Sequence, residues 1–279
     1  MKLEENQCIR EGDYMKINIH AGHNPDGKVG CGAVGLIKES TEARKVTFEV
    51  INILRKLGHT AYDCTVDNGT SQNDVLSKIV AKCNKHDVDL DVSIHFNSGR
   101  DDKTGDGSNS GTEVYIYSEN SKAKTAAERV CKAITGLGFR NRGVKVSTSL
   151  YVLKHTNSPA MLIECCFVDD KDDTKLYNYK TMAKAIAEGI LGAEIKSTST
   201  TTSKSTTSST TTLKSTKSTS YKVKITATVL NIRNGAGVSN VIVGQVKKDE
   251  VYTIVETKNG WGKLKSGVGW ILLKYTKEV

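Results

Sequence analysis

Several features that would place a protein in a special class are scarce in this sequence of 279 residues. Only two prolines occur and 37% of the residues are apolar, so most of the chain can build hydrophobic cores. No apolar run approaches the roughly 18 residues of a membrane-spanning helix, so we expect no membrane insertion. Residues 1–14 form a charged N-terminal extension without the apolar core of a signal peptide, so we expect synthesis in the cytoplasm without one.

The seven cysteines do not have the spacing of a known cysteine site. The sequence contains no Cys-x-x-Cys pair and no zinc-finger spacing, and seven is an odd number. We therefore expect free, mostly buried thiols, which are typical of a protein in a reducing compartment. The adjacent Cys165 and Cys166 indicate packing in a strand rather than chemistry.

Charge is unevenly distributed along the chain. Residues 1–192 contain 26 Lys and Arg against 26 Asp and Glu, whereas residues 193–279 contain 14 against 5, so the whole excess of +9 lies in the C-terminal part. Both tryptophans also lie there, and all seven cysteines lie at or before Cys166. A chain of this length can form one large and one small domain, and the change in composition predicts their boundary.

A segment of low complexity separates the two parts. Residues 196–220 are Ser, Thr and Lys, interrupted only by Leu213. A segment with a single apolar side chain cannot offset the entropy lost on ordering, so we predict a flexible linker over residues 193–220. The predicted domains then span residues 15–192 and 221–279.

The first domain alternates predicted strands and helices. Strands are indicated at 16–20, 60–65, 90–96, 112–118, 151–154 and 160–167, and amphipathic helices at 43–57, 75–83, 126–134 and 172–191. This alternation predicts an α/β fold with a mostly parallel or mixed sheet flanked by helices. In such folds, ligands bind at the carboxyl ends of the strands.

Three residues with metal-binding or acid–base side chains fall at or just beyond strand ends. They are His23, His95 and Glu164. Taken alone, a buried histidine is more often a hydrogen-bonded core residue than a ligand. Glu164 is harder to explain this way, because a carboxylate inside an apolar strand is costly unless it is paired or used. The three together favour a metal hydrolase.

Four motifs of this domain occur in the order found in a known family. Ala21-Gly22-His23 follows the opening strand, Glu39 begins the helix after a glycine-rich loop, and Ser93-Ile94-His95-Phe96-Asn97 ends a later strand. The last motif is Pro159-Ala-Met-Leu-Ile-Glu164-Cys-Cys-Phe167. Residues 16–192 thereby resemble the zinc-dependent N-acetylmuramoyl-L-alanine amidases of the type-3 family, which includes phage endolysins and bacterial autolysins.

The resemblance implies a set of site residues. It implies that His23, Glu39 and His95 hold one Zn²⁺ ion, and that Glu164 is the catalytic acid and base. Two imidazoles and one carboxylate leave the fourth zinc position open, as in catalytic zinc sites. Glu164 would accept a proton from water and later deliver one to the leaving amine.

Other residues are weaker candidates. Glu42, one turn further into the helix, is the alternative to Glu39, and Asp26 in the glycine-rich loop is a weaker one. His155 follows a predicted strand and could reach a substrate, although a histidine in a surface loop is the simpler interpretation.

The C-terminal part has the pattern of a small all-β domain. Strands are indicated at 228–235, 241–246, 251–256, 261–264 and 268–272, with polar or glycine-containing turns between them. Leu230-Asn-Ile-Arg-Asn-Gly235, Asn259-Gly-Trp261 and Gly269-Trp-Ile271 resemble a bacterial SH3-like domain, which implies a small barrel that binds the cell wall. We expect Trp270 in the core, whereas Trp261 could equally be a core residue or a ligand platform.

These observations predict a modular peptidoglycan hydrolase. The resemblance implies cleavage of the amide between N-acetylmuramic acid and L-alanine by a phage endolysin of a Gram-positive, clostridial host, released from the host cytoplasm to act on the wall. The expected partners are peptidoglycan and anionic wall polymers, because the basic part is attracted to polyanions. No RNA-binding signature occurs, so we expect no nucleic acid. The alternatives are a zinc peptidase that cuts the stem peptide and a non-catalytic wall-binding protein on a degenerate amidase scaffold.

Overall fold

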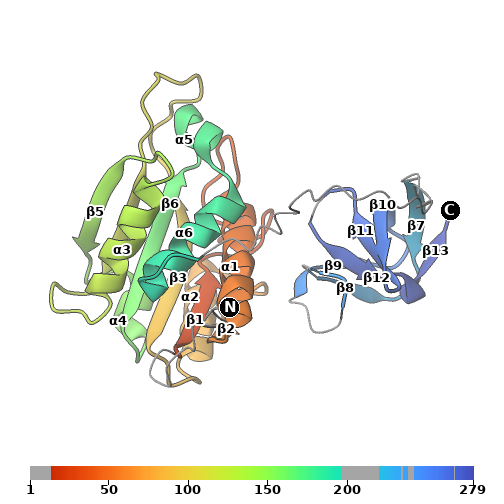
Figure 1. Cartoon of the computed structure of the whole chain (residues 1–279), viewed down its shortest axis with the longest axis horizontal. Helices are drawn as coiled ribbons and strands as arrows, with labels where there is room; N and C mark the ends of the chain where they lie inside the picture. Colours follow the sequence, from red (N-terminus) through yellow and green to blue (C-terminus); the bar gives the residue numbers. More distant parts are fainter. Residues whose placement is uncertain (1–13, 196–219, 234, 238–241, 267) are drawn as a thin grey trace, which may run out of the picture. The chain divides into compact units, whose positions relative to one another are not determined.

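The chain divides into two compact units (Figure 1). The computed structural model describes residues 14–195, 220–233, 235–237, 242–266 and 268–279, which belong to a unit up to Ile195 and a unit from Lys196. The predicted extension over residues 1–14 and the predicted linker over 193–220 lie almost entirely outside the described residues.

The first unit is built on one six-stranded sheet. Its strands run in the order β2-β1-β3-β6-β4-β5, and only the β4–β6 pair is antiparallel. The mixed sheet confirms the predicted fold class. The strands are β1 (Lys16–Ala21), β2 (Thr60–Asp63), β3 (Leu90–Asn97), β4 (Thr112–Ile116), β5 (Asn141–Val146) and β6 (Ala160–Phe167).

The described part of this unit also contains six helices, which lie on both sides of the sheet and at its end (Figure 1). On one side α6 packs between α1 and α3, and on the other side α2 contacts α4. The helices are α1 (Glu39–Lys56), α2 (Gln72–Cys83), α3 (Lys124–Thr135), α4 (Tyr151–His155), α5 (Lys171–Leu176) and α6 (Tyr179–Leu191).

Two element predictions in this unit were wrong, and one strand was not predicted. The segment 151–154 is helical because Val152 and Leu153, which a strand would point to opposite sides, are both buried in the cluster under α2. The predicted helix over 172–191 is two helices, because the side chain of Asn178 accepts backbone hydrogen bonds and starts α6 anew. Strand β5 was not predicted, since Gly143, with a φ of 84°, interrupts its alternation.

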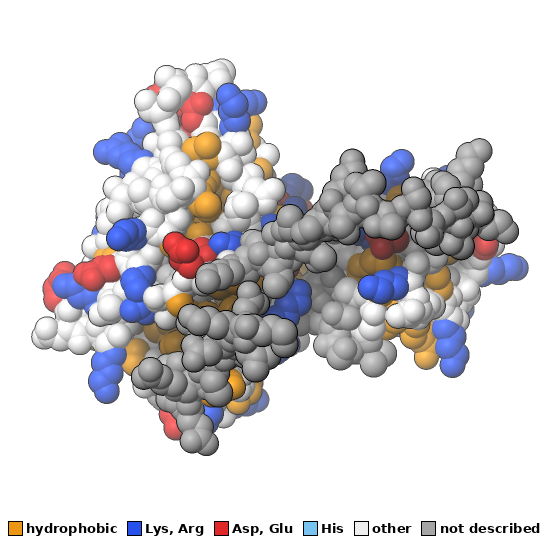
Figure 2. Space-filling model, viewed as in Figure 1, with side chains coloured by type: hydrophobic (Ala, Val, Ile, Leu, Met, Phe, Trp, Pro, Cys, Tyr) orange, Lys and Arg blue, Asp and Glu red, His pale blue; other side chains and the backbone are white. Residues whose placement is uncertain are grey.

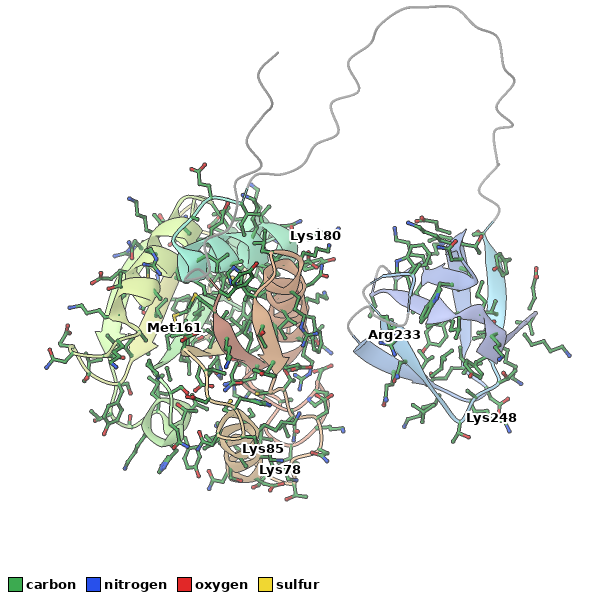
Figure 3. All side chains as sticks on the ribbon, turned by 60° about the horizontal axis from the view of Figure 1, so that its bottom comes forward. Lys78, Lys85, Met161, Lys180, Arg233 and Lys248 are labelled. Carbon is green, nitrogen blue, oxygen red and sulfur yellow. The ribbon has the colours of Figure 1, made fainter. Side chains whose placement is uncertain are left out.

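The two faces of the sheet differ in composition. Alternate residues of the central strands are apolar and fully buried, among them Ile19, Ile94, Ile163 and Val114. Figure 3 shows Met161, from the same set, inside the unit and Lys180 at its surface. The residues between them point to the other face, where an apolar cluster with α2 and α4 covers only part of the sheet.

The second unit is a single antiparallel sheet in the order β13-β7-β10-β11-β12-β8-β9. Seven strands replace the five predicted ones, since β7 and the short, apolar-free β13 were not recognised. Val223, Ile232, Ile254 and Ile271 belong to its core. The strands are β7 (Tyr221–Ile225), β8 (Val229–Arg233), β9 (Ile242–Lys247), β10 (Val251–Lys258), β11 (Trp261–Leu264), β12 (Trp270–Leu272) and β13 (Thr276–Glu278), with a 3₁₀ turn at Leu273–Tyr275.

The described residues carry neither a membrane helix nor a disulfide. No helix among them is long and apolar enough to cross a membrane. Six cysteines are described, all free, and all but Cys31 are buried, as the sequence predicted for the thiols. In Figure 2, acidic and basic side chains are interspersed on the visible face of the first unit, in keeping with its balanced charge.

Candidate metal centre

Three of the predicted site residues meet at the carboxyl end of the parallel strands. His23 lies in the loop after β1, Glu39 is the first residue of α1, and His95 lies on β3. Oε1 of Glu39 is 3.1 Å from Nε2 of His23 and 3.0 Å from Nδ1 of His95. Potential ligand atoms of the three residues lie within 4.8 Å of one another.

Backbone and side-chain hydrogen bonds hold this cluster. Glu39 accepts the backbone N–H groups of Phe96 and Ala33, at 3.2 and 2.7 Å. The Nε2 atom of His95 is 3.0 Å from the hydroxyl of Ser93. A hydrogen bond to that second ring nitrogen fixes the orientation of the imidazole and leaves Nδ1 directed at the cluster.

Gly22 lets the loop with His23 approach β3. Its N–H donates to the carbonyl of Ile94 at 3.1 Å. A Cβ atom at position 22 would lie 1.9 Å from the ring of His95, closer than any non-bonded contact allows. Only glycine therefore permits this packing of the loop against the imidazole.

Glu164 is the neighbour of His95 on the next strand. The two residues are opposite each other in the parallel β3–β6 pair. Oε2 of Glu164 is buried and has no hydrogen-bond partner among the described residues. A buried oxygen without a donor costs free energy of folding. A donor from a ligand or a water molecule would therefore fit there.

Burial and charge shift the acidity of these groups. Burial, together with the nearby carboxylates of Glu39 and Glu113, raises the pKa of Glu164 to about 8. Burial would also raise the pKa of Glu39, but hydrogen bonds from His23 and His95 outweigh it and hold that pKa below its usual range. Burial lowers the pKa of His95. The cluster thus favours an ionised Glu39 carboxylate beside a neutral His95 imidazole, which are the forms of these groups that bind metals.

The donor set fits a divalent metal ion. Imidazole nitrogen and carboxylate oxygen are ligands of zinc and of other first-row metals. Glu39 lies between two imidazoles at the start of a helix, where anions are favoured, and no Lys or Arg of the described residues is bonded to it.

The two alternatives to Glu39 lie outside the cluster. Glu42 accepts hydrogen bonds from Lys45 and from the hydroxyl of Tyr177. Asp26 pairs with Lys38 at 2.6 Å. Each carboxylate therefore already has a partner of its own, and the structure brings Glu39 to the histidines.

Comparison with known proteins identifies the first unit. Residues 17–195 match the Amidase_3 family model, described as N-acetylmuramoyl-L-alanine amidase. The chain belongs to this family. The matched range contains all four predicted site residues and, apart from Lys16 at the start of β1, the six-stranded sheet of this amidase unit.

Relatives include bacterial and phage proteins. An uncharacterised protein of Clostridium perfringens is 36% identical over 186 residues, which is 65% of this chain and 53% of that protein. The endolysin of Bacillus phage SPP1 is 30% identical over 181 residues, 61% of each chain. The chain thus spans between half and two thirds of the length of these relatives.

A solved structure covers the amidase unit. The catalytic domain of the CD27L endolysin, described as targeting Clostridia Difficile, superposes with a TM-score of 0.59 at 28% identity. The match covers 66% of this chain and 100% of that domain. The catalytic domain of amidase CwlV from Bacillus (Paenibacillus) polymyxa gives a TM-score of 0.52 at 26% identity, over 64% of this chain and 97% of that domain.

Three residues beside the candidate centre of the amidase unit were not predicted as site residues from the sequence. The guanidinium of Arg44 donates to the carbonyl of His23 at 2.6 Å and pairs with Asp67. Ser93 was read only as part of a motif. Glu113, a carboxylate inside the apolar strand β4, lies opposite Glu164. The signal that singled out Glu164, a charge within an apolar strand, would also have singled out Glu113.

Two other candidate groups do not join the centre. His155 ends α4 and packs beside Tyr151, with ring centroids 4.3 Å apart. A second acidic cluster brings together Asp102, Asp170 and Asp172. Each of its carboxylates accepts backbone N–H groups within the loop and at the start of α5, so these bonds account for the cluster.

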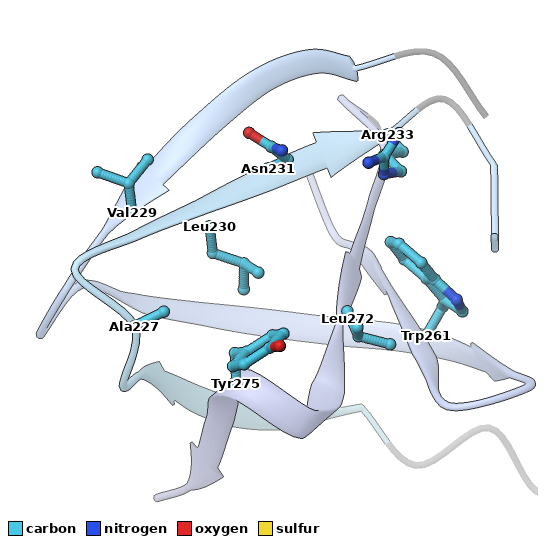
Figure 4. Close-up of a pocket in the computed structure, with 8 residues that line it drawn as sticks. All are labelled: Ala227, Val229, Leu230, Asn231, Arg233, Trp261, Leu272 and Tyr275. Atoms are coloured by element: carbon cyan, nitrogen blue, oxygen red, sulfur yellow. The ribbon is translucent and has the colours of Figure 1, made fainter. Parts of the chain in front are cut away.

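The second unit has a cavity of about 390 Å³ (Figure 4). Trp261 lines it although its side chain is buried, and Figure 4 shows Leu272 between the rings of Trp261 and Tyr275. Trp270, expected in the core, is only partly buried and has the ammonium of Lys263 5.8 Å from its ring. The lining residues are Ala227, Val229, Leu230, Asn231, Arg233, Trp261, Leu272 and Tyr275.

Proposed function

We propose that this chain is a zinc-dependent N-acetylmuramoyl-L-alanine amidase that lyses bacterial walls. It hydrolyses the amide between the lactyl group of N-acetylmuramic acid and the L-alanine of the stem peptide. The observation that carries the proposal is the meeting of His23, Glu39 and His95, with Glu164 on the adjacent strand, in a chain of the amidase family.

The three clustered residues would hold one Zn²⁺ ion. Two imidazoles and one carboxylate match catalytic zinc sites, which keep one position open. A zinc ion bound there supplies Lewis-acid activation of the scissile carbonyl and of a water molecule.

Glu164 is proposed to move the protons. Its carboxylate takes a proton from the attacking water and returns one to the leaving nitrogen of L-alanine. A pKa raised to about 8, mainly by burial, suits both steps. Near neutral pH both the ionised form, which accepts a proton, and the neutral form, which donates one, are then populated. Its buried, unpartnered oxygen is available for that exchange.

The second unit is proposed to bind the wall as an SH3-like domain. Its antiparallel sheet supports this assignment, as do Gly260-Trp261 and Gly269-Trp270, where a tryptophan begins the strand after a glycine. Residues 193–279 carry the whole positive excess, which favours anionic wall polymers and peptidoglycan as partners. A linker over 193–220 would raise the effective concentration of the amidase unit near its substrate.

The relatives support a lytic role against a Gram-positive host. One relative is a phage endolysin, another is a protein of Clostridium perfringens, and the superposed domain comes from an endolysin described as targeting Clostridia Difficile. We infer that this chain is a phage endolysin that acts on a clostridial wall.

End-group analysis of digested, purified clostridial wall tests the proposal. The full chain should release new amino ends on L-alanine only, a chelator should abolish the release, and added zinc should restore it. Metal analysis should find one zinc ion per chain. New amino ends on other residues would indicate a stem-peptide peptidase, and wall binding without any release would indicate a non-catalytic binder.

A further inference from the structure

Two basic side chains of strand β5 converge on one carboxylate beside the candidate centre. Nε of Arg142 donates to Oε2 of Glu113 at 2.7 Å, and Nζ of Lys145 donates to the same oxygen. The hydroxyl of Tyr115 and the amide of Asn97 donate to Oε1, at 3.0 and 2.8 Å.

A β-bulge makes this convergence possible. Residues three apart in a regular strand point to opposite faces, so Arg142 and Lys145 should not meet. The register of β4 and β5 shifts between Thr112 and Val114, and Gly143 there has a φ of 84°. A bulge with a glycine in this conformation adds one residue and brings both cations to the face of Glu113.

The positive charge of Arg142 and Lys145 together exceeds the negative charge of Glu113. The Glu113 side chain is only 3% exposed, whereas those of Arg142 and Lys145 are 27% and 39% exposed. Two positive charges face one negative charge, leaving an excess of one at the solvent side. Among the described residues, the terminal Nη atoms of Arg142 have no hydrogen-bond partner.

Glu113 and its two cations lie on the same row across the sheet as His95 of the candidate metal centre. His95, Glu164 and Glu113 are successive neighbours across β3, β6 and β4. Strands are spaced by about 4.8 Å, so Glu113 lies roughly 10 Å from His95 along the sheet. Two residues of an extended peptide span about 7 Å, and a carboxylate on the second residue reaches further.

The geometry points to a subsite for an anion of the substrate, which rests on the proposed function. We propose that Arg142 and Lys145, held by Glu113, bind the free carboxylate of the stem-peptide residue that follows L-alanine. Glu113 is a positioning residue, because it holds two cations side by side that would otherwise repel each other. Arg142 and Lys145 then select substrates with an acid rather than an amide at that residue.

Two matched substrates test the subsite. Muramoyl-L-alanyl-D-glutamate has the carboxylate, and muramoyl-L-alanyl-D-isoglutamine has an amide in its place. The wild-type chain should cleave the acid with a kcat/KM about ten-fold or more above that of the amide, because hydrogen bonds to a charged group are the stronger ones.

Variants separate recognition from structure. Lys145→Met should lower kcat/KM for the acid about ten-fold and leave the amide nearly unchanged, and Lys145→Arg should retain the preference. Lys180→Met is the control, since it removes an exposed lysine of α6, on the other side of the sheet. Equal thermal melting midpoints would show that the variants are folded.

The outcomes distinguish this subsite from the proposed amidase activity. Equal rates on both substrates, or equal loss on both in Lys145→Met, would overturn the subsite while the amidase activity stands. Cleavage of neither substrate would overturn the activity. In that case calorimetric binding of L-alanyl-D-glutamate against L-alanyl-D-isoglutamine decides the subsite, and equal affinity for the two peptides would reject it.

Discussion

The two faces of the six-stranded sheet are made by the same strands and have opposite characters. On β3, Val92 and Ile94 point to the face under α1, α3 and α6, while Ser93 and His95 point to the other. On β6, Ile163 and Glu164 divide in the same way. A shift of one residue in register would exchange the two faces, so the apolar packing also fixes where the chemistry lies.

The faces also differ in how their buried groups are satisfied. The apolar face is stabilised by burial, which depends on area and shape. On the polar face, Asn18 donates to Asp91, Ser93 lies within hydrogen-bonding distance of His95, and Glu113 accepts from four donors. Two buried carboxylate oxygens of this face, Oδ2 of Asp91 and Oε2 of Glu164, have no hydrogen-bond partner among the described residues. Of these two groups, Glu164 lies next to His95, and we assign the reaction to it.

The largest expected effect comes from Glu164→Gln on the polar face. We expect kcat to fall by about 10²–10⁴-fold, because general acid–base catalysis contributes that much. Zinc content should remain at the wild-type level, since the ligands are untouched. Released L-alanine amino ends and metal analysis measure the two effects.

The control for this variant is Glu119→Gln, which removes an exposed carboxylate paired with Lys124. It should retain full activity. Loss of zinc in Glu164→Gln would mean that Glu164 is a ligand and not the base.

The next largest effect should come from the neighbouring residue on the apolar face. Ile163 is fully buried between Ile94 and Val114 of the adjoining strands. Ile163→Ala should lower the free energy of unfolding by about 2–5 kcal/mol, and kcat of the folded protein should change little. Urea denaturation with activity measured at low temperature tests this, and a large fall in kcat without loss of stability would contradict the division between faces.

A smaller effect concerns pH and the buried His20 of the polar face. Burial, together with the charge of His95, lowers the pKa of His20 to about 3, whereas the unfolded value is 6.5. The unfolded chain therefore binds the extra proton first, and stability falls as the pH falls from 6.5 toward 3. At pH 4.5 this loss is on the order of 3 kcal/mol relative to pH 7.5.

The variant His20→Gln should remove that part of the acid sensitivity. Denaturant unfolding of both proteins at pH 4.5 and 7.5, with a chelator present, measures it without a contribution from metal release. An unchanged difference between the two pH values in the variant would show that His20 is not the titrating group.

The smallest effect is expected on the outside of the helices. Lys184 and Glu188 form an ion pair one turn apart on α6. Lys184→Met should change stability by less than about 0.5 kcal/mol and leave activity unchanged, because such pairs contribute little. A larger loss by thermal melting would mean that the stability of the apolar side depends on its surface charges.

Much of the polar face could be predicted from sequence, because the local pattern around most of its site residues is clear. His23, His95 and Glu164 stand at strand ends whose apolar alternation is plain in the sequence. Glu39 depended on resemblance to a family, because its partners lie 16 residues before and 56 residues after it in the chain. Whether these residues take the proposed roles stays a prediction.

The group around Glu113 could not be predicted in the same way. Arg142 and Lys145 share a face only because of the bulge at Gly143. From sequence alone, a glycine in a segment without regular alternation predicts a turn rather than a bulged strand. Likewise, α4 was mistaken for a strand, since a five-residue element is too short for periodicity to separate helix from strand. Such features depend on tertiary pairing rather than on local pattern.

The place of β6 in the sheet has a consequence for the timing of synthesis. β6 is the last strand of the amidase unit to be made, yet it lies in the middle of the sheet, between β3 and β4. A nascent chain that ends before residue 160 has the three clustered residues but leaves their sheet in two separate pieces. Glu164 then arrives on the segment that joins those pieces, so closure of the sheet and acquisition of the proposed base are a single event.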